Sequence, residues 1–166
     1  MSNGKNLNFN TVNHDEWLTP KYITDELGPF DLDPCSPIVR PWDTALKHIN
    51  KLEDGLSSEW FGMVWLNPPY GKEAIKWMNK LKDHGDGIAL IFARTDTKLF
   101  QENVLVHAKS MFLIKGRIRF CFVDGTSALE NAGAPSVLIA YGKEADANLL
   151  EASKKQTIKG VYIKLN

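Results

Sequence analysis

The 166-residue sequence is short of cysteine, of net charge and of long apolar runs. Its 2 cysteines, Cys35 and Cys121, cannot form a disulfide framework, and its 4 histidines have no zinc-ligand spacing with them, so we expect no metal site. No apolar run approaches the roughly 18 residues of a membrane-spanning helix, and the polar first residues lack the apolar core of a secretion signal. These absences favour a protein of the reducing cytoplasm with no membrane partner.

The charges of the chain balance. Lys and Arg together number 20 and Asp and Glu together number 20, so the formal net charge at pH 7 is zero. This balance disfavours a protein held to nucleic acid mainly by bulk charge, although a local basic face is compatible with it.

Apolar strands alternate with amphipathic helices along most of the chain. We expect a flexible, polar N-terminal arm over residues 1–13 and a single domain over residues 14–166. The alternation predicts an α/β fold with a mainly parallel sheet covered on both sides. The predicted strands are 30–35, 63–67, 87–93, 111–116 and 161–165, and the predicted helices are 20–27, 71–85, 97–108 and 144–155.

Several local details accompany this pattern. Thr19 is expected to cap the first helix, with Pro20 in its first turn and Gly28-Pro29 ending it. Residues 36–59 are expected to form a long loop with one helical turn around 43–50, and segments 118–123 and 136–142 an antiparallel hairpin at one edge. The apolar face of the second helix is predicted to consist of Ala74, Ile75, Met78 and Leu81.

The stretch Asn67-Pro68-Pro69-Tyr70 follows a buried strand directly. One interpretation is that two consecutive prolines serve only to end the strand. They also fix the backbone without N–H donors, so the Asn67 side chain and the Pro68 carbonyl can be held as two acceptors for an exocyclic amino group. Tyr70 then supplies an aromatic face on which a planar base can stack. This chemistry suits methylation of a ring-conjugated amine, which for a base in a duplex requires flipping the nucleotide out.

The stretch FDLDPC places Asp33 at the end of another predicted strand. In a parallel sheet, ligands bind beyond the carboxyl ends of the strands. Asp33 is therefore either a solvated carboxylate or an acceptor for the amino group or hydroxyls of a nucleoside-like cofactor. No glycine-rich phosphate motif follows this strand, so a cofactor with a pyrophosphate is not indicated.

The two stretches just described belong to a set of six short motifs. In chain order these are DEWLTP, FDLDPCS, EDGL, WLNPPYG, LIFARTDTKLF and GRIRF. Together, over about residues 14–142, they resemble the phage-type DNA N6-adenine methyltransferase (Dam-like) family. The resemblance implies a Rossmann-like methyltransferase fold, S-adenosyl-L-methionine as methyl donor and DNA as partner, with no obligate protein partner. It also implies a protein of the bacterial host's cytoplasm that is encoded by a bacteriophage or prophage.

The resemblance carries over to particular positions. Asn67, Pro68, Pro69 and Tyr70 match the family's catalytic motif, while Thr19-Pro20 resembles a motif that contacts the methionine half of the cofactor. Asp54 resembles the acidic residue that reads the cofactor's adenine. The usual glycine pair after Asp33-Pro34 is replaced by Cys35-Ser36-Pro37, and the ribose ligand is unassigned. The implied cofactor-binding residues are Trp17, Thr19, Pro20, Asp33, Pro34, Cys35, Asp54 and Asn67.

Basic residues after the later strands form a candidate substrate-binding group. Each of them alone is equally well explained as part of a solvated surface, but as a group they suit a phosphate-binding patch. The group comprises Lys72, Arg94, Lys115, Arg117 and Arg119. No separate recognition domain is evident, so target specificity is expected from loops 36–60 and 124–135.

Competing interpretations remain at this level. Cytosine C5 methyltransferases use a Pro-Cys nucleophile and a later Glu-Asn-Val. This chain contains both, as Pro34-Cys35 and Glu102-Asn103-Val104. Only 33 residues precede Pro34, too few for the upstream cofactor strands that such an enzyme needs. The asparagine and proline motif also suits an RNA or protein-glutamine methyltransferase, or a catalytically silent nucleic-acid-binding relative.

Overall fold

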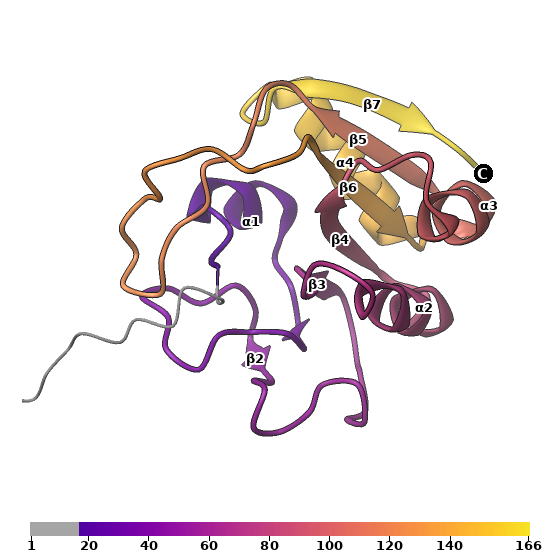
Figure 1. The fold of residues 1–166 in the computed structure, drawn as a ribbon. Coiled ribbons are helices and arrows are strands. Elements are labelled where there is room, and N and C mark those ends of the chain that lie inside the picture. The colour runs from indigo at the N-terminus through magenta and orange to yellow at the C-terminus, as the bar shows by residue number, and fades with distance from the viewer. Residues whose placement is uncertain (1–16) are drawn as a thin grey trace, which may run out of the picture.

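A seven-stranded sheet organises residues 17–166, the part of the chain that the structure, a computed structural model, describes (Figure 1). The predicted arm over residues 1–13 lies outside the described residues. The strand order is β2-β1-β3-β4-β6-β5-β7. The strands are β1 Leu32–Asp33, β2 Lys47–His48, β3 Val64–Leu66, β4 Gly87–Phe92, β5 Ser110–Ile114, β6 Ser136–Tyr141 and β7 Gly160–Lys164.

The direction of the strands changes halfway across the sheet. Strands β2, β1, β3 and β4 are parallel. Strand β6 is antiparallel to β4 and to β5, and β7 is antiparallel to β5. The α/β class is therefore confirmed, but the sheet is mixed rather than mainly parallel.

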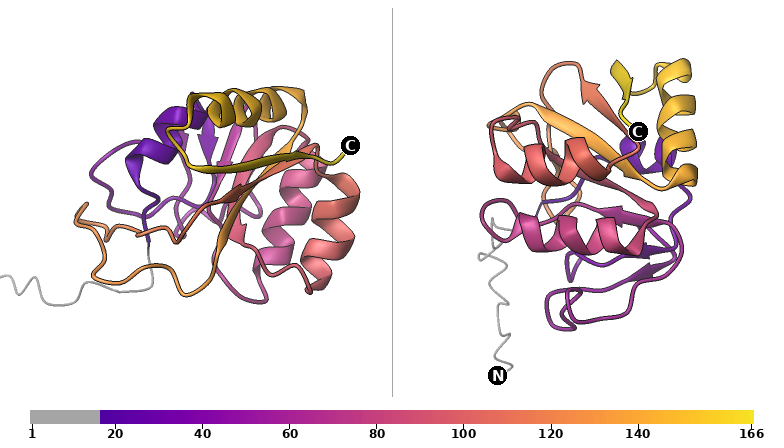
Figure 2. Two further views of the ribbon diagram at one scale, coloured as in Figure 1. Left: turned by 90° about the horizontal axis from the view of Figure 1, so that it is seen from above. Right: turned by 90° about the vertical axis from the view of Figure 1, so that its right-hand side faces the viewer.

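Helices cover both faces of the sheet (Figure 2). The helices are α1 Lys21–Leu27, α2 Ala74–His84, the π-helix η1 Leu99–Val104, α3 Leu105–His107 and α4 Lys143–Lys155. Helices α1 and α4 share one apolar core with Trp65 of β3. Helix α2 and η1 share the other with Val64 and Leu66. Because successive strand residues face opposite sides, the continuous apolar run of β3 supplies both cores.

Two local expectations about helices are wrong. Pro20, not Thr19, occupies the N-cap of α1, and no side chain caps that helix. In α2 the buried face includes Trp77, whereas Ile75 is 39% exposed, since the residue after Ala74 turns away from the face that Met78 and Leu81 share. The helix predicted over 97–108 is present over 99–107, as the π-helix η1 followed by α3.

Two expectations about pairing are also wrong. Residues 43–50 contain β2 instead of a helical turn, because the free edge of β1 accepts and donates backbone hydrogen bonds to them, such as Ile49 N–H to Asp33 O at 2.9 Å. Segment 118–123 does not pair with β6, whose two edges are already taken by β4 and β5. Instead, Cys121 makes isolated antiparallel bridges to Leu18 and Ser127.

The carboxyl ends of β1, β3 and β4 lie together at one edge of the sheet. Leu32 is in register with Val64, and Val64 with Gly87, so β1, β3 and β4 end side by side. Strand β5 runs in the same sense as β4, because both are antiparallel to β6. Asp33, Asn67 and the loop after β5 therefore emerge at this edge, where parallel sheets bind ligands. Among the described residues no helix is long and apolar enough to span a membrane.

Candidate active site

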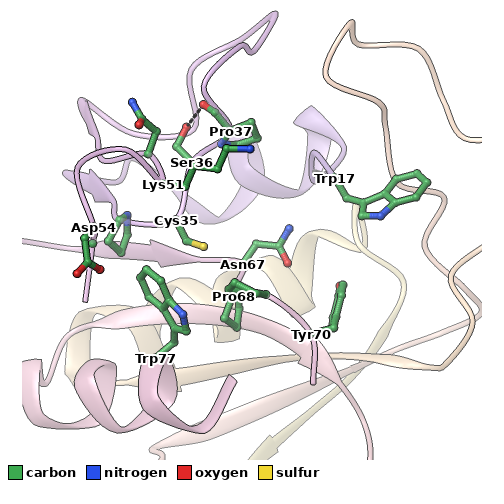
Figure 3. Close-up of a pocket in the computed structure, with 14 residues that line it drawn as sticks. Trp17, Cys35, Ser36, Pro37, Lys51, Asp54, Asn67, Pro68, Tyr70 and Trp77 are labelled. Atoms are coloured by element: carbon green, nitrogen blue, oxygen red, sulfur yellow. Dashed lines mark hydrogen bonds between the residues drawn. The ribbon is translucent and has the colours of Figure 1, made fainter. Parts of the chain in front are cut away.

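A cavity of about 650 Å³ opens at this edge (Figure 3). Five parts of the chain form it: Trp17 before α1, the turn after β1, the loop before β3, the turn after β3, and Trp77 of α2. The lining residues are Trp17, Pro34, Cys35, Ser36, Pro37, Asn50, Lys51, Asp54, Gly55, Asn67, Pro68, Pro69, Tyr70 and Trp77. We call this space the first cavity.

Asn67 is half-buried on the turn after β3, and its side-chain amide extends toward the side on which Trp17 and Tyr70 lie (Figure 3). The amide oxygen of Asn67 is buried and has no hydrogen-bond partner among the described residues. Buried polar atoms in folded proteins are almost always hydrogen-bonded. An unpaired acceptor on the wall of a cavity is therefore a site prepared for a donor on a ligand.

Tyr70 is held by its neighbours as a fixed aromatic surface. Its ring stacks on Phe92, the last residue of β4, with centroids 4.1 Å apart and an interplanar angle of 9°. Phe120 meets it edge-on at 6.4 Å. Burial raises the pKa of the Tyr70 phenol above its usual value, so Tyr70 stays protonated at neutral pH. Tyr70 is 39% exposed and lines both cavities.

A second cavity of about 470 Å³ adjoins the first. Its walls are the aromatic side chains of Trp17, Tyr70, Phe92, Phe120 and Phe122, with the loop over residues 128–133. Trp17 and Tyr70 line both cavities, so the two spaces meet at these side chains, whereas Asn67 lines the first cavity only. The sequence did not indicate Phe92, Phe120 or Phe122, although the alternation of apolar residues over 118–122 was a usable signal.

Backbone pairing between distant segments holds Trp17 in this wall. The Leu18 N–H donates to Cys121 O and the Cys121 N–H donates to Leu18 O, each at 2.9 Å. The Trp17 ring packs on Phe122 with centroids 5.2 Å apart. The predicted contribution of Trp17 to a ligand site thus depends on a contact more than 100 residues away in the chain.

Asp33 lies behind the wall of the first cavity rather than on it. Its side chain is buried, accepting hydrogen bonds from the Thr44 hydroxyl at 2.5 Å and the Cys35 N–H at 3.1 Å. Burial raises the pKa of the Asp33 carboxyl to about 6, against the opposing effect of these hydrogen bonds. Asp33 therefore shapes the turn 34–37, of which Pro34 and Cys35 line the cavity; cofactor contacts of these three residues stay a prediction.

Asp54 lines the first cavity, from a backbone conformation that is unusual for a residue other than glycine, with φ at +54°. One of its carboxylate oxygens accepts a hydrogen bond from the Leu56 N–H at 3.1 Å. The next residue, Gly55, packs so closely on the turn after β1 that a Cβ there would lie 1.9 Å from Pro34 O. The glycine is thus required for close approach of the two loops that carry Asp54 and Cys35.

Trp77 is the largest lining residue that the sequence did not indicate. It is buried on α2 and points into the first cavity below Asp54 and beside Pro68 (Figure 3). The other lining residues that were missed are Ser36, Pro37, Asn50, Lys51 and Gly55. The predicted apolar face of α2 contained Ile75 instead of Trp77, so Trp77 was missed both as a core residue and as a lining residue.

Thr19 and Pro20 are buried and line neither cavity. The Thr19 hydroxyl is buried without a hydrogen-bond partner among residues 17–166. A cofactor contact for either residue stays a prediction.

The five candidate substrate-binding residues are exposed and flank the cavities without lining them. They follow β3, β4 and β5, so they belong to the same edge of the sheet. The Arg94 guanidinium lies 5.9 Å from the Phe92 ring centroid, and Arg117 donates to Ala132 O at 3.1 Å. Lys72, Lys115 and Arg119 are exposed as well, and we call the five residues together the basic border.

The residues of a cytosine C5 mechanism are not brought together. Cys35 lines the first cavity, whereas Glu102 is exposed on η1 and lines neither cavity. Across residues 17–166, no group of His, Cys, Asp and Glu side chains is placed to hold a metal ion.

Comparison with known protein families identifies the family of the chain. The family model described as DNA N-6-adenine-methyltransferase (Dam) matches residues 7–159 of the chain. The chain belongs to this Dam family. Searches of curated proteins and of solved structures each found no match.

Proposed function

We propose that the protein transfers a methyl group from S-adenosylmethionine to the N6 amino group of adenine in DNA. The observation that carries the proposal is the buried, unpaired amide oxygen of Asn67 on the wall of the first cavity, on the same turn as Tyr70, which lines both cavities. A methyl donor in one space and an amine acceptor in the other would meet at this atom. Membership of the Dam family supports adenine in DNA as the acceptor.

The first cavity suits a nucleoside sulfonium in size and chemistry. Its volume of about 650 Å³ lies in the range of ligand sites for molecules of that size. Trp77, Pro34 and Pro68 provide apolar walls, while the Asp54 carboxylate is an acceptor suited to an adenine amino group. S-adenosylmethionine bound there supplies an electrophilic methyl group.

The second cavity suits the acceptor base. A flipped adenine can stack on the open face of Tyr70, whose opposite face is occupied by Phe92. The adenine amino group then donates to the Asn67 amide oxygen and the Pro68 carbonyl. These two hydrogen bonds favour a pyramidal amino nitrogen and stabilise the positive charge that develops on it during transfer. Because Pro68 and Pro69 have fixed backbones, these acceptors need little reorganisation.

The remaining assignments extend the same proposal. Residues 14–166 act as one methyltransferase domain with a Rossmann-like arrangement, and an antiparallel unit of β5, β6 and β7 closes the sheet beside the acceptor cavity. The basic border formed by Lys72, Arg94, Lys115, Arg117 and Arg119 contacts DNA phosphates. Action in the cytoplasm of a bacterial host, from a phage or prophage gene, rests on the sequence resemblance alone.

Nucleoside mass analysis of DNA from cells expressing the protein tests the function directly. We expect N6-methyladenine above the level in cells that express Asn67→Ala at equal abundance. In parallel, purified protein is given radiolabelled S-adenosylmethionine with DNA, RNA or a protein extract. Label entering only RNA or protein would overturn the choice of DNA, and 5-methylcytosine lost on Cys35→Ala would overturn the choice of adenine.

A further inference from the structure

Lys80 of α2 makes a set of contacts that the two cavities do not explain. Its ammonium donates to three backbone carbonyls of one loop: Gly55 O at 3.3 Å, Leu56 O at 2.6 Å and Ser58 O at 2.5 Å. The ammonium also lies 5.1 Å from the centroid of the Trp60 ring. Lys80 is half-buried and lines neither cavity, so it does not touch a ligand bound in them.

The loop that Lys80 holds is the one that carries Asp54. The Asp54 carbonyl accepts backbone hydrogen bonds from Ser57 at 3.2 Å and Ser58 at 3.1 Å, which closes the loop on itself. The indole N–H of Trp60 donates to Gly55 O at 2.8 Å, sharing that carbonyl with Lys80. The carbonyls of this loop therefore turn toward α2, while Asp54 lines the cavity.

The opposite side of the same loop is pressed against the turn after β1. Gly55 approaches Pro34 O so closely that there is no room for a Cβ. Any shift of the loop away from α2 therefore changes the contact with the turn that carries Cys35. Trp77, one helical turn before Lys80, lines the cavity between these segments. Lys80 and Trp77 thus fix two sides of one ligand space from a single helix.

The geometry points to Lys80 as a positioning residue for the methyl donor: its ammonium locks the 54–58 loop so that Asp54 is in place before the cofactor binds. This inference rests on the proposed function, because it takes S-adenosylmethionine as the ligand of the first cavity. A hydrogen bond from a charged donor is worth more than a neutral one, and preorganised loops bind with less ordering cost. The effect belongs to cofactor binding and not to the transfer step, since Asn67 and Tyr70 have no contact with this loop among the hydrogen bonds and ring contacts of the structure.

Calorimetric titration with S-adenosylmethionine tests the role of Lys80. Lys80→Met keeps the aliphatic stem over Trp60 but removes the donors, and we expect its cofactor affinity to fall about tenfold or more. Lys80→Arg restores donors and should recover most of the affinity. The matched control is Lys82→Met on the same helix, where the ammonium pairs with Asp83 at 3.2 Å; its affinity should equal that of the native protein.

Two further measurements separate positioning from general destabilisation. With DNA as acceptor, Lys80→Met should raise the KM for cofactor about as much as it weakens binding, while kcat at saturation stays within about twofold. Hydrogen exchange of the ligand-free variant should accelerate over residues 53–60 and not over 63–70. If Lys80→Met does not fold, Lys80→Gln, which keeps one amide donor, takes its place, with an intermediate loss of affinity expected.

The outcomes are distinct. Native affinity in Lys80→Met, or a fall in kcat with KM unchanged, overturns the role of Lys80 and leaves the proposed function standing. Absence of cofactor binding in the native protein and in Lys82→Met alike overturns the proposed function, and the role of Lys80 with it.

Discussion

Asn67 is polar, half-buried and unpaired, a combination that folding alone does not favour. Its amide oxygen is buried without a partner on the wall of the first cavity, on the turn that also carries Tyr70. Tyr70, three residues on, is fixed by Phe92 rather than left mobile. Both residues are therefore set before any ligand arrives.

Replacing Asn67 by Ala should separate transfer from binding. Loss of one preorganised acceptor is expected to lower kcat by about 10²- to 10³-fold, with a much smaller change in cofactor affinity. Asn67→Asp keeps an acceptor oxygen and should retain more activity than the Ala variant. Single-turnover transfer and calorimetry on the same samples make the comparison, and equal loss of both would assign Asn67 to the cofactor instead.

Asp33 should make stability depend on pH in an unusual direction. Its pKa is raised to about 6 by burial, from 3.8. A carboxyl that is easier to protonate in the folded state stabilises the fold fully below the unfolded pKa and loses that contribution as pH rises through 6. The loss amounts to ~3 kcal/mol, at 1.36 kcal/mol for each pKa unit.

Urea unfolding of native protein and Asp33→Asn at pH 4 and pH 7 measures this contribution. The free energy of unfolding of the native protein, relative to that of Asp33→Asn, should fall between the two pH values by about that amount. A difference independent of pH would show that Asp33 is charged throughout this range.

At the scale of elements, the first cavity depends on how tightly two loops and one helix pack. The loop around Asp54 lies against the turn after β1, and both lie over α2. Neither loop has regular secondary structure across this contact. The two loops approach closely because Gly55 has no side chain, and the hydrogen bonds from Lys80 to loop carbonyls hold the Asp54 loop in place.

Gly55→Ala should push these loops apart. A Cβ at this position would lie 1.9 Å from Pro34 O, and both atoms belong to the backbone framework, so neither can rotate away. We expect a loss of ~1–3 kcal/mol in the free energy of unfolding and at least tenfold weaker cofactor binding. Gly133→Ala, where a Cβ meets open space, should leave cofactor affinity unchanged. Native affinity in Gly55→Ala would mean that the cofactor does not use this junction.

At the scale of the whole molecule, both cavities lie at one edge of the sheet, formed by segments between Trp17 and Gly133. A ligand in the first cavity contacts the turns after β1 and β3 together with α2. It should therefore stabilise the fold as a whole rather than a single loop.

S-adenosylmethionine at a hundred times its dissociation constant should stabilise the protein by ~2.7 kcal/mol. For a chain of this size that corresponds to a rise in Tm of about 5–10 °C in a thermal scan. A dinucleotide with a pyrophosphate is the control and should give no rise, because no glycine-rich phosphate motif follows β1. Equal stabilisation by both ligands would contradict the assignment of the first cavity.

Local sequence was sufficient for features that depend on neighbours in the chain. The apolar runs of β3 and β4 and the turn signals around them predicted the α/β class and the convergence of Asp33 and Asn67. The two prolines after Asn67 also defined a rigid turn, since proline restricts its own φ regardless of the fold. These are statements about single segments, and short-range stereochemistry determines them.

Tertiary structure alone decided what those segments meet. Segment 118–123 has the alternation of a strand, yet β6 was already paired on both edges, so its apolar side chains became the wall of a cavity. Trp77 was absent from the predicted apolar face of α2, yet it is buried and lines the first cavity. Asp33 was predicted at the ligand-binding edge, yet its carboxylate binds the Thr44 hydroxyl and does not line that cavity. Such outcomes depend on which distant surfaces come into contact, and the spacing of residues along one chain does not contain that information.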